Sequence, residues 1–470
     1  MLLIPAALLL TACVSQRPGP TSSACERASF DLELLAEQQA VYVSEPRSVA
    51  GYPYLGTNRF LASLPNAQWS MQQRSAWVQR LFDAGEERRA ILHRLTKDDS
   101  AVSGDSQRNL ATDCETAIDR GPLLGPKWAD LVSAAQVPDD YSGWWRAVGL
   151  YSVTNLPVRS GVKRLQAELY DAFTTQVGAF ASQSQLAYYR LADTENTEPQ
   201  SSRRDALGLR LPDDSTLEAM FSAYSPVWAI EQLGDYDKPG VPSRTIEGDL
   251  GFDDSRPSVY SYASLTQFAG AVRLQLNYLI WFEARPADGT FDILAGKLDG
   301  VHWRVTLGDD GRPLIFDSVH PCGCYHSFYP LPGIAVRASA MESPEPPLVH
   351  PLAEPLRTNP PMVLIESGSH YVRGVADATP GRNDTLQPMQ LLGYESLYFS
   401  TEDSPSRLFD KRGIIRGTER LERFSLWPMG VLSPGAMRER GRHATAFLGR
   451  RHFDAGDLLD QLFYLEGAQL

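Results

Sequence analysis

The strongest constraint on the fold is a dipeptide that recurs in the middle of the chain. An Asp-Gly pair occurs three times between apolar segments, eleven residues apart each time, at Asp288-Gly289, Asp299-Gly300 and Asp310-Gly311. Asp tolerates a positive φ and Gly carries no Cβ, so this pair is typical of tight hairpin turns. The sequence therefore predicts an antiparallel β-meander over about residues 271–326.

The meander is expected to contain four strands. Its first segment alternates apolar and polar residues before it becomes wholly apolar, which is the pattern of a strand that enters a core. The expected strands are Val272–Glu283, Phe291–Ala295, His302–Leu307 and Leu314–Val319. If the last hairpin folds about Asp310-Gly311, His302 lies near His320, where the metal-binding residue types are most concentrated.

The rest of the chain predicts an α+β fold with a mainly helical region at 25–193, a linker at 194–206 and a larger mixed region at 207–470. Apolar residues at helical spacing predict amphipathic helices over 69–95, 126–136 and 162–180. Shorter helices are expected at 215–221, opened by a capping box at Ser215, and at 457–465. The aromatic residues Trp144, Trp145 and Tyr151 are expected to pack in the core.

Composition limits the class of partner. The 470-residue chain has 43% hydrophobic and 21% charged residues, which is typical of a globular protein, and a net charge of −13. Nucleic-acid binding requires clustered Lys and Arg to contact phosphates. The acidic balance therefore argues against a nucleic-acid partner.

The N-terminus has the pattern of a secretion signal. An apolar run ends at Leu10-Thr-Ala-Cys13 and is too short for a transmembrane helix, which needs about 20 apolar residues. Leu10 to Cys13 resembles the lipobox of bacterial lipoproteins. The resemblance implies a signal peptide at 1–12, a diacylglycerol thioether and fatty acyl chain such as palmitate on Cys13, and anchoring in a lipid bilayer. Val14, in place of Asp, implies the outer membrane on its periplasmic side.

Residues 13–24 are predicted to be a flexible tether, because Pro, Gly and Ser dominate this segment. With Cys13 acylated, four cysteines remain in an oxidising compartment. The simplest pairing joins Cys25 to Cys114. In the chain-entropy model a disulfide that closes a loop of this length stabilises the fold by roughly 4 kcal/mol.

The segment His320-Pro-Cys-Gly-Cys-Tyr-His326 contains four side chains that bind metals. Together with His302 they form the candidate ligand set His302, His320, Cys322, Cys324 and His326. Thiolate and imidazole together suit Zn or Cu, and do not suit Mg²⁺ or Ca²⁺. Two other interpretations remain open: a disulfide between Cys322 and Cys324 across Gly323, or simple packing at the end of a sheet.

Two further segments contain residue types that are suited to catalysis or binding. Ser369-His370 resembles a nucleophile and base pair, but neighbouring residues of a strand point to opposite faces and there is no G-x-S-x-G motif. His443 and His452 lie in an Arg-rich run, for which ion pairs to Asp454 and Asp457 are a simpler explanation than an anion site.

These observations favour a cell-envelope lipoprotein that acts as an interaction or assembly module, with an envelope protein or glycan as partner. The alternative is a periplasmic metal-dependent enzyme, a hydrolase. Its Zn or Cu would be held by His302, His320 and His326 with Cys322 or Cys324 assisting.

Overall fold

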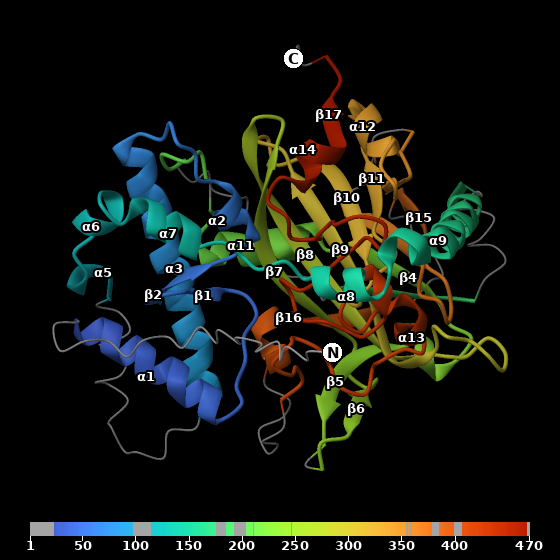
Figure 1. Ribbon diagram of the computed structural model, residues 1–470. Helices are drawn as coiled ribbons and strands as arrows, with labels where there is room; N and C mark the ends of the chain where they lie inside the picture. The colour runs from blue at the N-terminus through green and yellow to red at the C-terminus, as the bar shows by residue number, and fades with distance from the viewer. Residues whose placement is uncertain are drawn as a thin grey trace, which may run out of the picture.

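The computed structural model describes residues 23–96, 114–174, 185–191, 204–209, 211–245, 247–353, 356, 360–377, 385–398 and 407–467. Within these residues 13 strands form one curled, mixed sheet with helices against it, which confirms the predicted α+β class. Along the main path the strand order is β13-β11-β10-β9-β8-β7-β16-β3-β4-β14-β15, and β5 and β6 extend from β8 (Figure 1).

The predicted meander is the centre of this sheet. Four consecutive antiparallel strands are β7 (Ser258–Phe268), β8 (Ala271–Arg285), β9 (Gly296–Leu307) and β10 (Pro313–Val319), followed by β11 (Ser327–Pro330). Gly311 has φ 78° in the β9–β10 turn, as the Asp310-Gly311 pair predicts. His302 pairs with Val319, so the predicted register at this hairpin is confirmed.

The central Asp-Gly pair does not form a turn, and this prediction was wrong. Asp299 and Gly300 lie inside β9 and pair with Phe282 and Trp281 of β8. A Cβ on Gly300 would lie 2.5 Å from the carbonyl oxygen of Ile280, so this glycine permits close packing of backbone. The predicted strand Phe291–Ala295 is instead part of the loop before β9, where Phe291 is 91% exposed.

The remaining strands come from distant parts of the chain. β3, which precedes the predicted linker, pairs with β4 and β16 in the main sheet, while most of 194–206 lies outside the described residues. Two small sheets, β1 with β2 and β12 with β17, lie apart from it. These strands are β1 (Arg47–Val49), β2 (Tyr52–Thr57), β3 (Leu186–Leu191), β4 (Val227–Glu231), β5 (Pro239–Arg244), β6 (Leu250–Asp253), β12 (Ile334–Val336), β13 (Leu348–Val349), β14 (Pro361–Ile365), β15 (Val372–Asp377), β16 (Leu386–Gly393) and β17 (Phe463–Leu465).

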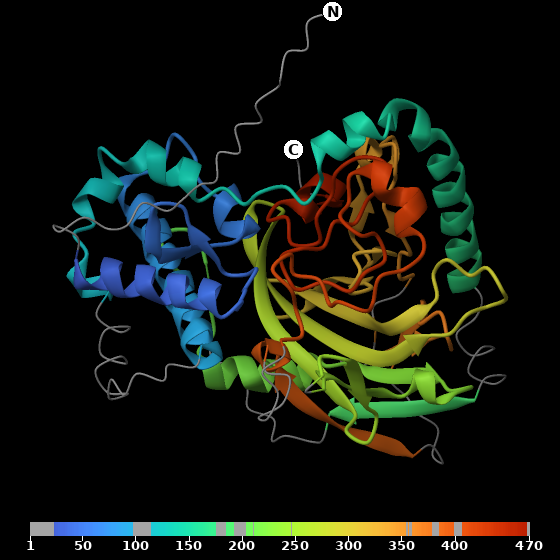
Figure 2. The ribbon, with the colours of Figure 1, turned by 60° about the horizontal axis from the view of Figure 1, so that its bottom comes forward.

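The sheet buries side chains on both faces. Alternate residues of β8, including Leu276, Tyr278 and Ile280, pack into one core with Val301 and Trp303 of β9. The opposite face meets the C-terminal segment 407–457, which has little regular secondary structure and lies inside the curve of the sheet (Figure 2). This arrangement buries polar residues of the C-terminal segment against the strands.

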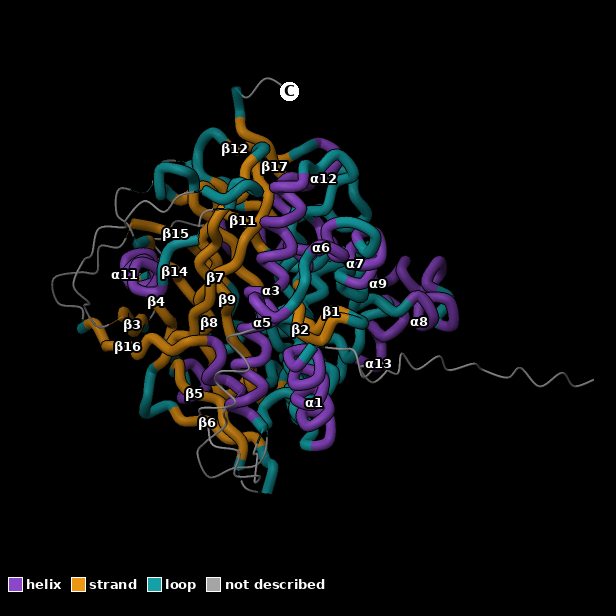
Figure 3. Tube along the Cα trace, turned by 90° about the vertical axis from the view of Figure 1, so that its left-hand side faces the viewer, coloured by secondary structure: helices purple, strands orange, loops and turns teal. Residues whose placement is uncertain are grey.

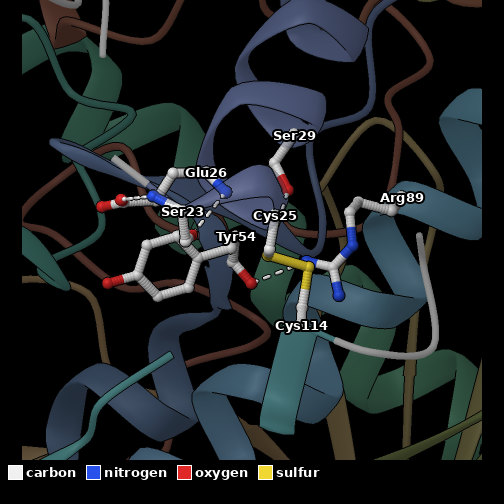
Figure 4. Close-up of a disulfide and its surroundings, with 7 residues drawn as sticks. All are labelled: Ser23, Cys25, Glu26, Ser29, Tyr54, Arg89 and Cys114. Carbon is white, nitrogen blue, oxygen red and sulfur yellow. Dashed lines mark hydrogen bonds between the residues drawn. A yellow bond between two sulfur atoms is a disulfide. The ribbon is translucent and has the colours of Figure 1, made fainter. Parts of the chain in front are cut away.

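The N-terminal helices form a layer beside the sheet, as Figure 3 shows from the side. Cys25, near the start of α1, forms a disulfide with Cys114 of α5, which confirms the predicted pairing. Ser23 and Glu26 form a capping box at the start of α1 (Figure 4). The first described helix therefore begins at Ala24, and residues 13–22 of the predicted tether lie outside the described residues.

Several helices match the sequence pattern and others correct it. α3 (Met71–Leu95) is confirmed, whereas α9 begins earlier than expected, at Tyr151, and residues 175–180 of its predicted span lie outside the described residues. The capping residue of α11 is Asp213 rather than Ser215, because the Asp213 carboxylate accepts a hydrogen bond from the Thr216 amide.

The helices expected over 126–136 and 457–465 appear as shorter ones, and the others were not individually predicted. The remaining helices are α1 (Ala24–Gln38), α2 (Arg59–Ser63), α5 (Cys114–Ala117), α6 (Gly121–Leu124), α7 (Trp128–Ala134), α8 (Gly143–Val148), α9 (Tyr151–Thr174), α11 (Asp214–Tyr224), α12 (Ala338–Met341), α13 (Arg423–Leu426) and α14 (Leu458–Leu462), with 3-10 turns η1 (Asp235–Asp237), η2 (Tyr394–Tyr398) and η3 (Trp427–Met429). No helix among the described residues is long and apolar enough to cross a bilayer.

Candidate functional site

The candidate site is centred on Asp299, which is buried in β9. Its Oδ1 lies 3.0 Å from Nδ1 of His320, which directly follows β10, and its Oδ2 lies 3.0 Å from Nδ1 of His370. One carboxylate thus accepts hydrogen bonds from two imidazoles. Phe282 pairs with Asp299 across the strands, and its ring stacks on that of His370 at 3.9 Å between centroids.

A second carboxylate lies on the far side of His370. Nε2 of His370 is 3.4 Å from Oδ1 of Asp237, in η1. Asp237 also accepts hydrogen bonds from the Gly368 amide at 2.8 Å and from the Ser367 hydroxyl at 2.8 Å. His370 has φ 55°, and a non-glycine residue held in this region is often found at a functional site. The four side chains Asp237, His370, Asp299 and His320 are called the Asp–His chain below.

The charges in the Asp–His chain follow from its contacts. Burial alone would raise the pKa of Asp299, but the contacts with His320 and His370 outweigh it and hold that pKa well below its usual value. Burial would likewise lower the pKa of His370, yet its two carboxylate partners raise it. The pKa of His320 is lowered, because burial outweighs the single contact with Asp299. At neutral pH the chain therefore has two carboxylates and a neutral His320, while the two carboxylates favour the protonated form of His370.

His320 lines a small cavity. Nδ1 is held by Asp299, and Nε2 has no hydrogen-bond partner among the described residues. The imidazole lines a cavity of about 10 Å³, close to the space that one water molecule needs, together with Tyr325, Tyr371 and Ser318. The ring centroids of Tyr325 and Tyr371 lie 4.9 and 5.7 Å from that of His320.

Arg285 supplies a positive charge at the same place. Its Nη2 donates a hydrogen bond to the Tyr371 hydroxyl at 3.1 Å, and its guanidinium lies 5.0 Å from the Tyr371 ring centroid. The pKa of Tyr325 is raised well above its usual value by burial, so this hydroxyl keeps its proton and is able to donate. A neutral base and hydroxyl donors therefore share one cavity.

A larger chamber of about 230 Å³ adjoins this cavity beneath α9. Tyr325 and Leu169 line both spaces. The wall contributed by α9 is mainly apolar, with Val158, Val162, Leu165 and Leu169 beside Gly161 and the polar Gln166. On the opposite wall lie Arg451 and Glu422, and burial raises the pKa of Glu422 to about 7. The chamber suits a molecule with an apolar portion and a polar end.

A separate polar cluster lies on the opposite face of β9. Arg304 donates to both oxygens of Asp317, at 2.9 and 2.7 Å, and Nε2 of His326 lies 2.9 Å from Oδ2 of the same carboxylate. Nε2 of His302 lies 3.2 Å from Oδ1 of Asn277. Burial lowers the pKa of His326 to about 4. This cluster is closely packed and joins the meander to the C-terminal segment.

The predicted metal ligands are not brought together. Successive strand residues point to opposite faces, so His302 faces away from Asp299 and from the His320 bound to it. His326 turns to Asp317 instead. Among the described residues no group of three His, Cys, Asp or Glu side chains is placed to hold one metal ion.

Cys322 and Cys324 are free thiols that line the large chamber. The Cys324 amide donates a hydrogen bond to the Cys322 sulfur at 3.3 Å. The contact with Cys322 and burial raise the pKa of Cys324 well above its usual value, so this residue is a thiol and not a thiolate. In the structure the two sulfur atoms are therefore not joined in a disulfide, so the prediction of a disulfide across Gly323 was wrong.

The two other candidate segments have structural partners. The Ser369 hydroxyl donates to Glu366 at 2.5 Å, while His370 belongs to the Asp–His chain, so the two residues are not a nucleophile and base pair. In the Arg-rich run His452 lies 3.3 Å from Asp139, and His443 lies against His302 with 6.2 Å between ring centroids. The ion pairs of this run are therefore made to a different part of the chain than expected.

Sequence reasoning missed Asp237, Asp299, Arg285, Tyr325 and Tyr371. The prediction placed Asp299 in a turn, because an Asp-Gly pair between apolar segments is the same pattern that marks a hairpin. No protein-family model matches the chain, and the searches of curated proteins and of solved structures found no match either. The functional argument therefore depends on the site itself.

Proposed function

We propose that the chain is a lipid-anchored hydrolase of the cell envelope, in which His320 acts as a general base. The observation that carries the proposal is the state of His320: Nδ1 donates to the ionised Asp299, and the unpartnered Nε2 belongs to an imidazole that lines a water-sized cavity. An oriented neutral imidazole of this kind is suited to remove a proton from water.

The surrounding groups fit attack of that water on a carbonyl carbon. As the proton moves to Nε2 of His320, Asp299 stabilises the imidazolium that forms. When the bond between the carbonyl carbon and the leaving oxygen or nitrogen then breaks, the imidazolium returns this proton to the leaving group, which releases the acid and regenerates neutral His320. The hydroxyls of Tyr325 and Tyr371, the latter bonded to Arg285, line the same cavity and would stabilise negative charge on the carbonyl oxygen. The adjoining apolar chamber would hold an acyl group of the substrate. We therefore propose an ester or amide of an apolar acid as the substrate class.

The buried charges support a functional role. Desolvating several ionisable groups costs free energy, and an apolar core of the same shape is often at least as stable. Clusters of buried groups with shifted pKa values beside a cavity are typical of active sites. The metal-dependent version of this enzyme has less support, because its five predicted ligands are divided between two faces of the sheet.

The proposed cellular location rests on the sequence. The Leu10 to Cys13 lipobox supports acylation of Cys13 and the periplasmic side of the outer membrane. The disulfide between Cys25 and Cys114 supports an oxidising compartment. Labelling cells with a radioactive fatty acid tests this location: wild type should carry the label and Cys13→Ala should not.

The hydrolase is tested with 4-nitrophenyl esters of short to medium fatty acids. His320→Gln should lose turnover by about 100-fold or more, because the base is removed. The control is His452→Gln, since His452 also lies beside a carboxylate but lines neither cavity. Equal turnover by wild type and His320→Gln would contradict the proposal.

A second candidate is the non-catalytic interaction or assembly module. Large apolar side chains on α8 and α9 are exposed, which favours a surface that contacts another component of the envelope. Co-sedimentation with purified peptidoglycan, and cross-linking to envelope proteins in cells, test this role. Binding without hydrolysis of any ester would favour the module over the enzyme.

A further inference from the structure

The arm formed by α8 and the first part of α9, residues 143–167, is called the α8–α9 arm. It carries apolar side chains that the fold does not cover: Trp144 is 74% exposed and Leu150 is 67% exposed. Val148, Val153 and Leu156 are exposed as well. The expectation that Trp144 packs in the core was therefore wrong. Large apolar side chains gathered in so short a segment mark a surface that contacts something else.

The fold holds this apolar tip outward. Leu150, between the two helices, has φ 49°, a strained value for a leucine. Gly149 beside it packs against Pro428, where a Cβ would come within 2.6 Å of the proline Cβ. The arm is thus fixed at its base on η3, and the strained turn keeps Leu150 exposed. Figures 1 and 2 show α8 and α9 along the outside of the molecule.

The charge of the arm is opposite to that of the whole protein. The net charge of the chain is −13, yet no Asp or Glu occurs from Ser142 to Ala167. Arg159, Lys163 and Arg164 are exposed, and none of them forms an ion pair with any described residue. These three cations therefore remain available to an anionic surface.

The two sides of α9 differ in what they face. Val158, Val162 and Leu165 face the chamber. By helical periodicity Leu156 and Lys163 lie on the opposite side. Exposed apolar and basic residues thus share the outer side of the helix. This combination is typical of helices that lie in the interface of an anionic bilayer.

The neighbouring α13 and its flanks extend the apolar surface. α8 and α9 both contact η3, which follows α13 directly. Leu421, Phe424 and Trp427 are exposed there, and Arg423 lies among them. Trp and Phe beside Arg and Lys suit the boundary between head groups and acyl chains.

We propose that the α8–α9 arm is a docking surface for an anionic lipid bilayer. The apolar side chains would enter the interface while Arg159, Lys163 and Arg164 contact the lipid phosphates. The proposal is independent of the hydrolase chemistry, since no residue of the Asp–His chain belongs to the arm. It is also separate from the acylated Cys13, because the arm would bind lipid without the anchor.

The test uses the chain from Val14 onward, which lacks the acylated cysteine and keeps every described residue. It is sedimented with vesicles of phosphatidylglycerol and phosphatidylethanolamine, and with vesicles of phosphatidylcholine alone. We expect binding to the anionic vesicles that is lost at an ionic strength of about 0.5 M.

Two variants remove the two features of the arm. Leu150→Ser/Val153→Ser/Leu156→Ser should weaken partitioning by about tenfold or more, and so should Arg159→Glu/Lys163→Glu/Arg164→Glu. The control is Leu34→Ser/Met71→Ser, which removes exposed apolar side chains from α1 and α3 and should bind like wild type. Because all of these residues are exposed, circular dichroism should show the wild-type fold in each variant.

Two outcomes would overturn the proposal. The first is equal binding of wild type and both arm variants to anionic vesicles. The second is no vesicle binding, with concentration-dependent self-association in sedimentation velocity that the apolar arm variant abolishes. That result would assign the arm to contact between two copies of this protein. Ester turnover is measured on the same samples, and its loss or persistence decides the hydrolase proposal separately.

Discussion

Nδ1 of His320 lies 3.0 Å from Oδ1 of Asp299, and both side chains are buried. Because the carboxylate accepts the proton on Nδ1, the lone pair of the neutral imidazole is on Nε2. The same carboxylate is held from its other side by His370. The position and the tautomer of His320 are therefore set by residues from three separate segments of the chain.

Replacing Asp299 with Asn should lower kcat for ester hydrolysis by about 10²–10⁴-fold, since the amide holds the imidazole in the wrong tautomer and no longer stabilises its charge. KM should change little, because Asp299 lines neither cavity. Steady-state kinetics with the most reactive 4-nitrophenyl ester measures both constants. Asp139→Asn is the control, because Asp139 also lies beside a histidine but far from the site in sequence and contacts. A similar loss in both variants would contradict the role of Asp299.

The protein should lose stability as the pH falls from 6.5 towards 4. Burial lowers the pKa of His326, His350 and His452 to about 4 and that of His443 to about 3. Each of these groups takes up a proton near pH 6.5 when unfolded but only near its lower pKa when folded. Stability is therefore complete above 6.5 and decreases below it, by on the order of 3 kcal/mol for each histidine. Urea unfolding followed by circular dichroism at several pH values measures the slope.

His370 should change the stability in the opposite direction. Its pKa is raised by Asp237 and Asp299, so its contribution to the free energy of unfolding is complete below pH 6.5 and is lost as the pH rises through the raised pKa.

His350→Leu is a control for the loss of stability at acid pH, because His350 packs among the rings of Phe173 and Tyr329 and the cause of its pKa shift is burial alone. That variant should show a shallower acid slope, and an unchanged slope would exclude His350 from the effect.

The Asp-Gly pairs show what local sequence can predict about the fold and what it cannot. Asp310-Gly311 was assigned correctly, because the short turn over Asp309, Asp310 and Gly311 is determined by the φ preferences of its own residues, with Gly311 at φ 78°. Asp299-Gly300 has the same two residues and lies within a strand. What distinguishes it is the pair of imidazoles that compensate the buried charge, 21 and 71 residues further along the chain. Such partners leave no periodic signal beside Asp299.

The five candidate metal ligands do not converge among the described residues, for a related reason. The hairpin register that places His302 beside Val319 was predictable. The register alone, however, does not say to which face of the sheet each side chain points. Successive residues of a strand point to opposite faces of the sheet. An offset of one residue along the strand therefore moves a side chain to the other face. His302 and His320 were therefore close in register but reach different sides of β9, to Asn277 and Asp299.

Two glycines in long helices should respond oppositely to alanine. A Cβ on Gly85 of α3 would lie 2.2 Å from the carbonyl oxygen of Tyr54 in β2, so Gly85→Ala should destabilise the protein by about 1–3 kcal/mol or more. At Gly161 of α9 a Cβ meets nothing within 4 Å, and Gly161→Ala should stabilise by up to about 1 kcal/mol through helix propensity. Thermal and urea unfolding compare the two. Destabilisation of similar size at both positions would show that helix propensity and packing were assigned incorrectly.

The chain from Val14 onward should contain two titratable thiols when denatured without reductant, and four after reduction. Cys322 and Cys324 are free in the structure, while Cys25 and Cys114 form the disulfide. Because the predicted ligands are divided between two faces of the sheet, the same sample should bind neither Zn nor Cu stoichiometrically. Cys25→Ser/Cys114→Ser should lower stability by roughly 4 kcal/mol, whereas Cys322→Ser/Cys324→Ser should remove both thiols and retain the fold. No thiol in the denatured wild type would indicate a second disulfide, and one equivalent of metal lost in the second variant would restore the metal interpretation.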